Sequence, residues 1–515
     1  MDALVGQFSL TGGALLVAIL VILVRPLILS IYNLVGHPLS PLPGRKTWAA
    51  SRVPFLWALI RGKLVHEIED MHRRFGPIVR VAPDEVAYAH PDAWNDILQA
   101  KAGYLPFPKD PTWWAPMPGA APGLVTGVDH DLHALVRRQL SPGFTSRALA
   151  TQEGTVHQYV DLLVERWREA VSSGQGEAEV DVMRWFNYMT FDILGDLAFA
   201  ESFECLQRSE YHGWISLIFD NLKFNGAMIS ARFYPMVDSI LAMLIPASLV
   251  KAQKAHAQLI VDKVRRRLDS TSQRLDFIST IQTNIQDTDY KNDKGLPLDV
   301  VHATFSELTI AGSETTAMAL SAALNLLIHH VDEREVLVRE IRGHFGSYEE
   351  ITVQSVRDMV YMNAVLNEVL RLCPPVPWMP PRKVPDRGRM VCGRWLPGGT
   401  RVSITFTSMH REPTSFHAPS SFCPERWLPE ATDNPDSPFH NDKRHAVQPF
   451  TLGPHSCIGQ NLAWAEMRIA LAKVLWSFDI AAPEDEKKWV VWESLRTFLL
   501  IEKKPIAVVL KPRAD

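Results

Sequence analysis

The sequence predicts a mainly helical protein with small β-sheets, preceded by one N-terminal transmembrane helix. Apolar residues recur at three- and four-residue spacing from residue 65 to about residue 370, which is the helical period. Short alternating stretches, such as Val79-Arg80-Val81 and Val402-Ser403-Ile404, indicate strands. An uncharged run from Ala3 to Val24 is long enough, at ~1.5 Å per helical residue, to cross the hydrocarbon core of a bilayer.

The composition limits the classes of function. The chain has 515 residues, of which 47% are hydrophobic and 21% are charged, and its formal net charge is −4. These values exclude a disordered polymer and give no electrostatic reason to expect a nucleic-acid partner. None of the cysteines forms a C-x-x-C pair or has a histidine at zinc-finger spacing, so we expect no disulfide framework and a reducing compartment. The five are Cys205, Cys373, Cys392, Cys423 and Cys457.

The N-terminal run has a competing interpretation as a cleavable signal peptide. However, its leading end carries Asp2 and no basic residue. Three basic residues instead follow the run: Arg25, Arg45 and Lys46. This charge bias predicts that residues 1–36 form a membrane anchor and that the body faces the cytosol. The second apolar stretch, residues 27–35, is too short to cross a bilayer alone and is predicted to extend the helix or lie in the interface.

Two further boundaries follow from composition. Residues 37–64 are predicted to be a proline-rich hinge segment, and residues 65–515 a single catalytic domain, because no linker or repeat divides the chain after residue 50. The prolines between Pro38 and Gly44 disfavour a helix and favour a stiff extended arm. An ordinary loop is the alternative.

One predicted helix is unusually long. Some thirty residues without proline separate Pro297 from Asp332, with Asp299 as a candidate N-cap, so this helix must cross the domain. Its middle, residues 311–316, contains a glycine that costs ~1 kcal/mol of helix propensity and a glutamate that is costly to bury. Either the small residues allow close packing, with hydroxyls bonded to the preceding turn, or the segment opens a groove against a ligand.

A loop rich in glycine and proline, Phe450 to Gly459, leads directly into a helix with an apolar face. It places Cys457 at or just before the helix N-terminus, where unpaired N–H groups favour thiolate over thiol. A thiolate on a rigid loop suits an axial ligand of haem iron, because it pushes electron density onto the metal. Gly453 and Gly459 are predicted to let the backbone lie close to a flat macrocycle.

Phe450, Gly453, Cys457 and Gly459 match the pattern F-x-x-G-x-x-x-C-x-G, and here the chain resembles the cytochrome P450 monooxygenases. The resemblance implies the cytochrome P450 fold and haem b (iron protoporphyrin IX) as cofactor. It makes Cys457 the metal ligand and the other three residues contacts of the cofactor. The remaining four cysteines lack this context and are interpreted as structural.

The segment Ala311 to Thr316 resembles the A-G-x-E-T-T motif of the same family. The resemblance implies that Thr315 hydrogen-bonds iron-bound dioxygen and that Glu314 relays protons towards it. Cleavage of the O–O bond consumes two protons, and a hydroxyl beside a carboxyl can pass them inward from solvent.

Glu368 and Arg371 stand three residues apart on a predicted helix and can pair directly, although this spacing alone says little. The later Pro424-Glu425-Arg426-Trp427 resembles the P-E-R-F/W element of the family. The resemblance implies that Arg426 joins the pair in a buried network with a structural role, in which loss of any member is costly.

The two propionates of haem need cationic or hydrogen-bond-donating partners. By resemblance, Arg382 is one of them, and His133 with Arg137 matches an H/W-x-x-x-R helix that contacts a propionate. A surface position is the alternative for His133. His455 stands where many family members have arginine, and its imidazole can donate a hydrogen bond with less assured charge.

The resemblance also suggests substrate contacts: Trp113, Trp114, Ala311, Val376 and Phe498, with Phe107 and Met117 nearby. For each aromatic residue, structural packing is the alternative. The apolar region 219–250 is predicted either to rest on the membrane or to form a plain helical core.

Together these features predict a single-pass haem-thiolate monooxygenase of the endoplasmic reticulum that inserts one oxygen atom from O2 into a lipophilic small molecule. No flavin domain fits the remaining length, so electrons must come from a separate protein, by resemblance NADPH–cytochrome P450 reductase. The segments 409–413 and 427–429 are similar to fungal members that modify secondary metabolites, including the isotrichodermin-hydroxylase-like branch. The alternatives are a haem-thiolate isomerase or dehydratase, in which the Glu314-Thr315 relay would be idle, and a non-catalytic haem-binding sensor.

Overall fold

The computed structural model describes residues 24–100, 105–116, 119–210, 226–244, 247–271, 274, 276–282, 285–286 and 295–514. The predicted membrane helix therefore lies outside the described residues except for Val24. The same holds for Met117 and, in the apolar region, for residues 219–225 and 245–246. Within the described ranges, no helix combines the length and the apolar character that crossing a bilayer requires.

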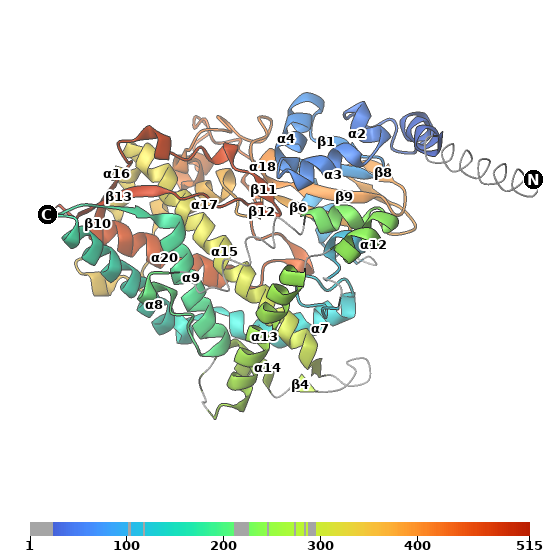
Figure 1. Ribbon diagram of the computed structural model, residues 1–515. Helices are drawn as coiled ribbons and strands as arrows, with labels where there is room; N and C mark the ends of the chain where they lie inside the picture. The colour runs from blue at the N-terminus through green and yellow to red at the C-terminus, as the bar shows by residue number, and fades with distance from the viewer. Residues whose placement is uncertain are drawn as a thin grey trace, which may run out of the picture.

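Helices form most of the body, as predicted (Figure 1). The longer helices are α4 (Leu64–Phe75), α7 (His130–Leu140), α8 (Ser146–Ser173), α9 (Val182–Phe199), α12 (Pro235–Leu244), α13 (Ala247–Asp269), α15 (Leu298–His329), α16 (Val331–His344), α17 (Val360–Leu372) and α20 (Gln460–Ser477). The shorter helices are α2 (Lys46–Ala50), α3 (Val53–Ile60), α5 (Asp92–Leu98), α6 (Pro111–Trp114), α10 (Cys205–Arg208), α14 (Phe277–Ile281), α18 (Phe406–His410) and α19 (Pro429–Asp433). Single 3-10 turns are η1 (Ser141–Phe144), η3 (Tyr348–Glu350), η4 (Pro424–Trp427), η5 (Arg444–Ala446), η6 (Gly453–His455), η7 (Glu486–Lys488) and η8 (Trp492–Ser494). Residues 24–35 and 226–232 are also helical.

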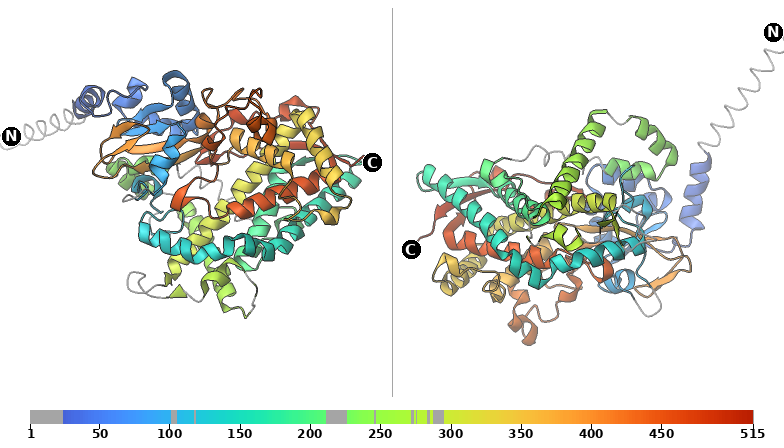
Figure 2. Two further views of the ribbon diagram at one scale, coloured as in Figure 1. Left: turned by 180° about the vertical axis from the view of Figure 1, so that it is seen from behind. Right: turned by 90° about the horizontal axis from the view of Figure 1, so that it is seen from below.

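The sheets are small. A four-stranded sheet has the order β1 (Ile78–Ala82), β2 (Glu85–Tyr88), β9 (Arg401–Thr405), β6 (Trp378–Lys383). A three-stranded sheet has the order β10 (Phe478–Ala481), β13 (Ala507–Pro512), β3 (Ala178–Asp181). The two-stranded pairs are β4 (Ile285–Gln286) with β5 (Leu296–Pro297), β7 (Arg389–Val391) with β8 (Arg394–Leu396), and β11 (Thr497–Phe498) with β12 (Leu500–Ile501). Figures 1 and 2 place the four-stranded sheet at the end of the body nearest residues 24–35 and the C-terminus at the opposite end.

The two alternating stretches do form strands, β1 and β9, of the four-stranded sheet. β2 lies between them and pairs in parallel with β9, where Val86 faces Val402. Their polar residues are nevertheless buried, because apolar clusters cover both faces of the sheet. The Arg80 guanidinium is 1% exposed and donates to the carbonyl of Asn33 at 2.8 Å. The alternation of apolar and polar residues therefore predicted the strands correctly, but it does not mark a solvent-exposed face of this sheet.

The proline-rich segment differs from the predicted extended arm. Residues 36–42 form successive turns, and the Leu42 N–H donates to the Leu39 carbonyl at 3.1 Å. Both leucines are buried in the cluster that contains Val86 and Val402. Burial of these two side chains against the sheet favours a compact segment over a stiff arm, because apolar area leaves water.

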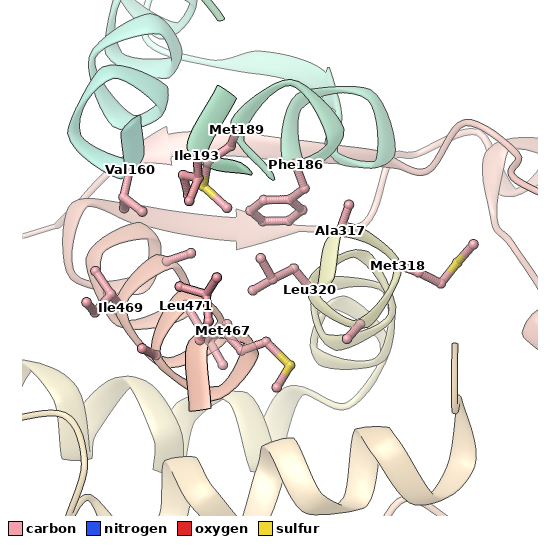
Figure 3. Packing of buried hydrophobic residues seen from close by; sticks show 14 of the residues in the cluster. Val160, Phe186, Met189, Ile193, Ala317, Met318, Leu320, Met467, Ile469 and Leu471 are labelled. Atoms are coloured by element: carbon pink, nitrogen blue, oxygen red, sulfur yellow. The ribbon is translucent and has the colours of Figure 1, made fainter. Parts of the chain in front are cut away.

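The long predicted helix is confirmed as α15, which runs through the helical part of the body (Figure 1). It begins at Leu298 with Pro297 as N-cap, so Asp299 lies in the first turn and is not the N-cap. In Figure 3, Leu320 of α15 lies between Phe186 of α9 and Leu471 of α20. This packing fixes α15 between its neighbours and thereby fixes the residues in its middle.

Candidate active site: a cysteine loop facing the central helix

The cysteine loop contains η6 and ends at the start of α20, so Cys457 lies between these two elements. Its geometry is tight: the Cys457 N–H donates to the Phe450 carbonyl at 2.8 Å, and Gly459 is the N-cap of α20. Gly453 has φ +74°, and a Cβ there would collide with the Leu98 carbonyl. Gly453 therefore needs to be glycine for its backbone conformation and this contact, and its predicted approach to a macrocycle stays a prediction.

The loop and α15 enclose a cavity of about 330 Å³. Phe450, Cys457 and Gly459 line it from the loop, and Ala311, Gly312 and Thr315 line it from α15. Most other lining side chains are apolar, and they include Val125, Leu194, Leu308, Leu370, Val376 and Phe406. The cysteine thus faces the small residues of α15 across an apolar space.

The charge state of Cys457 follows from its surroundings. Burial raises the pKa of the thiol, although the Gly459 N–H and the Arg137 guanidinium lower it. We predicted that the helix N-terminus lowers this pKa, and the Gly459 N–H does act in that direction, but α20 begins only at Gln460 and burial outweighs the local donors. Coordination to a metal cation deprotonates a thiol outright, so a bound iron would supply the missing stabilisation.

The middle of α15 divides its polar side chains between two sides. The Thr315 hydroxyl donates to the Ala311 carbonyl at 2.7 Å beside the cavity, and the Ser313 hydroxyl donates to the Thr309 carbonyl at 2.5 Å. Glu314 does not line the cavity; it is 2% exposed and forms an ion pair with Lys503. Both interpretations of residues 311–316 therefore hold in part. The hydroxyls donate to carbonyls of the preceding turn, as close packing predicted, and Thr315 also borders the cavity.

The ion pair between Glu314 and Lys503 joins α15 to the segment before β13. Burial raises the pKa of Glu314 despite Lys503, and it lowers the pKa of Lys503 to about 8. Lys503 also donates to the Asn187 side-chain oxygen, while Glu314 Oε1 has no hydrogen-bond partner among the described residues. Sequence reasoning missed Lys503, because nothing distinguishes it from the adjacent Lys504.

Replacing Lys503 with methionine is expected to lower the free energy of unfolding by about 3 kcal/mol, because the Glu314 carboxylate stays buried without its cation. The double variant Glu314→Gln/Lys503→Met should lose less free energy of unfolding than the sum of the losses in the two single variants. Urea unfolding followed by tryptophan fluorescence measures all three. Lys504→Met is the matched control at an exposed neighbour, and strictly additive losses would contradict the pairing.

Four basic side chains gather beside the cavity and provide a test of whether haem fits. Arg382 and Lys109 are 3% and 5% exposed, and the His455 Nδ1 lies 3.1 Å from the His133 Nε2. Burial and mutual repulsion lower their pKa values: Arg382, by burial, to about 10, Lys109 to about 7, His133 to about 3 and His455 to about 2. A carboxylate opposes this lowering only at Lys109, where the nearby Glu307 acts to raise the pKa.

This cluster lacks the negative charge that would offset its burial, and the Arg382 Nε has no hydrogen-bond partner within the described ranges. Two propionates would supply that charge, so the residues fit haem. Sequence reasoning missed Lys109, whose Nζ donates to the carbonyls of Val125 and Gly127 at 2.6 and 3.0 Å.

Arg137 contacts the cysteine loop directly. Its guanidinium donates to the Ser456 hydroxyl at 3.1 Å and also to the Ser456 carbonyl, and its charge favours the Cys457 thiolate. Its contact with a propionate stays a prediction, because Arg137 is not among the residues that line the cavity, and neither are Arg382, Lys109 and His133.

Glu368, Arg371 and Arg426 come together in a buried network, and all three side chains are 0% exposed. Glu368 accepts two hydrogen bonds from Arg371, at 2.7 and 2.8 Å, and one from Arg426 at 3.0 Å. It also accepts from the Cys423 N–H and the Trp427 indole. Burial acts to raise the pKa of Glu368, but the two guanidiniums outweigh it and lower the pKa.

Two of the five suggested substrate contacts, Ala311 and Val376, line the cavity, and the other three do not. Trp113 packs edge-on against Trp378 at 5.2 Å between ring centres, and the Trp114 indole donates to the Pro381 carbonyl at 3.1 Å. Phe498 is buried and packs on Gly62. The packing interpretation therefore describes their observed contacts, because each ring packs against protein neighbours, although the Trp113 indole N–H has no hydrogen-bond partner among the described residues.

Sequence reasoning also missed a residue that supports the cavity wall from behind Val125. Glu307 of α15 accepts from the N–H groups of Val125 and Thr126 at 2.6 and 3.1 Å. It thereby fixes the loop whose Val125 side chain lines the cavity. No local sequence signal marks this contact, because its partners are far apart in the chain.

A sequence model of cytochrome P450 matches residues 47–509. The chain belongs to the cytochrome P450 family. The P450 is 37% identical to cytochrome P450 monooxygenase astJ of Aspergillus oryzae over 94% of each chain. It is 36% identical to the trichothecene C-15 hydroxylase of Fusarium sporotrichioides over 98% of each chain, and to the averantin hydroxylase of Aspergillus parasiticus over 98% of this chain and 99% of that one. This P450 is a haem-thiolate monooxygenase that receives NADPH electrons through a reductase.

Proposed function

We propose that this P450 oxidises a lipophilic small molecule in a tailoring step of fungal secondary metabolism, in line with the isotrichodermin-hydroxylase-like resemblance. The observation that carries the proposal is that Cys457 and Thr315 line one apolar cavity from opposite elements. Two relatives are named as hydroxylases, of a trichothecene at C-15 and of averantin. An apolar wall selects lipophilic substrates by burying their hydrocarbon surface.

The proposed roles follow from the geometry. Cys457 ligates the iron of haem, and haem when bound supplies the oxygen-activating chemistry. Arg382, His133, His455 and Lys109 hold the propionates, while Glu368, Arg371 and Arg426 stabilise the fold around the loop. The apolar walls exclude water, and the absence of large side chains at Ala311 and Gly312 leaves room beside Thr315.

Thr315 is proposed to control one hydrogen bond in the cavity. Its single hydroxyl proton is committed to the Ala311 carbonyl, so in this state Thr315 can only accept from a ligand. Rotation about its C–O bond frees the proton for donation into the cavity. Glu314, held by Lys503 on the other side of α15, is proposed to supply protons to this position.

Replacing Thr315 with alanine is expected to uncouple NADPH consumption from product formation, because the movable hydroxyl proton is lost. Thr315→Ser keeps the hydroxyl and should retain most of the coupling. Product and hydrogen peroxide formed per NADPH are measured side by side for both variants. Coupling in Thr315→Ala equal to that of the wild type would refute the role of the hydroxyl.

Residues 1–36 are proposed to anchor the protein in the endoplasmic reticulum membrane with residues 65–515 in the cytosol. Apolar side chains exposed to solvent support a membrane-facing surface at this end of the molecule (Figure 1). They are Leu27, Ile28, Ile31 and Val35 of residues 24–35, Trp57 and Ile60 of α3, and Met236 and Met243 of α12. Deletion of residues 1–36 should move the protein from the membrane fraction towards the soluble fraction.

The function is tested by expressing the full chain with an NADPH–cytochrome P450 reductase. Polyketide and terpene intermediates are screened for a mass gain of one oxygen atom. Product that depends on NADPH and O2 supports the proposal. NADPH-independent conversion would instead favour an isomerase or dehydratase, and haem binding without any turnover would favour a sensor.

A further inference from the structure

One acidic side chain in the cavity wall has no role in the site described above. Glu466 of α20 is 3% exposed, and it is the only acid among the described residues that line the cavity. Its lining neighbours on α20 and α17 are apolar: Leu462, Ala463, Met467 and Leu370. A carboxyl group in such surroundings is costly unless it is neutral or has a partner.

The partner of Glu466 is a hydroxyl on α15. The Thr316 side chain hydrogen-bonds to it, and no cation contributes to its pKa, which burial raises to about 8. The other buried acids of the site differ, since Glu368 has two guanidiniums and Glu314 has Lys503. Burial without a cation favours the neutral acid form of Glu466, which carries an O–H that it can donate.

The position of Thr316 connects this acid to the proposed chemistry. Thr316 directly follows Thr315 in α15, and both line the cavity. Glu466 thus reaches the cavity from α20, whereas Glu314 is outside the cavity lining and held by Lys503. The cavity has an acid of its own that needs no ion pair to break before it can give up a proton.

We propose that Glu466 is a second proton-holding residue of this P450, which releases its O–H proton to an acceptor in the cavity. The step leaves a carboxylate, which Thr316 stabilises by donating its hydroxyl proton in a hydrogen bond, and a proton from water later restores the acid. The inference rests on the monooxygenase function of the same cavity, because that reaction consumes two protons for each O2.

The charge state is tested without turnover. Infrared difference spectra between the wild type and Glu466→Gln, taken at neutral pH, should show the C=O band of one protonated carboxylic acid, shifted in D2O. Thr316→Val keeps the acid and should keep the band at a changed frequency. A difference spectrum with only carboxylate bands would overturn the proposal, even if haem binding and Thr315 behave as expected.

The proton-holding role is tested with NADPH, reductase and O2 in the absence of added substrate. Glu466→Gln preserves shape and a donor towards Thr316 but cannot release a proton. We expect a severalfold rise in hydrogen peroxide released per NADPH and an altered solvent isotope effect, with the reduced carbon monoxide spectrum unchanged. Glu466→Asp should restore part of the wild-type ratio. A wild-type ratio and isotope effect in Glu466→Gln would show a packing role only and would overturn the proposal.

Discussion

Serine in place of Cys457 is expected to abolish the strongly red-shifted Soret band of the reduced, carbon monoxide-treated protein and to reduce product formation to background. A serine oxygen donates far less electron density to iron than a thiolate does, and that donation is what favours O–O cleavage. The cavity has no second thiol to take its place among its described lining residues. Absorption spectra and NADPH-dependent turnover measure the two effects.

Cys392→Ser is the matched control for this change, because Cys392 lies on the turn between β7 and β8 and away from the cavity. It should keep the Soret band and the turnover of the wild type. A Cys457→Ser protein with an unchanged spectrum would remove the basis of the proposed site.

Replacing Glu368 with alanine is expected to lower the free energy of unfolding by about 3–5 kcal/mol, because the Arg371 guanidinium then stays buried without a carboxylate and Arg426 keeps only its ion pair with Asp442. That loss is a large share of the ~5–15 kcal/mol that stabilises a typical domain. Urea unfolding and the yield of haem-containing protein measure it. The exposed Glu165→Gln is the control, with an expected change within about 0.5 kcal/mol.

The same network predicts how the free energy of unfolding changes at acid pH. The pKa of Glu368 is lowered in the folded protein from its ordinary value of 4.5, so its contribution is fully present above that value. Stability falls as the pH decreases through the folded pKa. The free energy of unfolding should therefore fall less steeply below pH 4.5 in Glu368→Gln than in the wild type. Parallel curves for the two proteins would contradict this assignment.

The central helix shows how far sequence reasoning reached into the fold. Its length followed from the proline-free run, which is a local property, and α15 has nearly those bounds. The turns at residues 36–42 were not foreseen, because their conformation depends on burying Leu39 and Leu42 against strands that come later in the chain. Proline content describes the local backbone and does not describe this contact.

The sequence by itself determined the cysteine loop, the Thr315 position and the Glu368–Arg371 pair, because each lies within a few residues of its motif. Only the tertiary structure decided that Glu314 pairs with Lys503 and that Glu466 meets Thr316. These partners lie on different elements, and only the packing of α15 against its neighbours brings them together. Burial then sets their charge states, which a linear pattern of residue types does not encode.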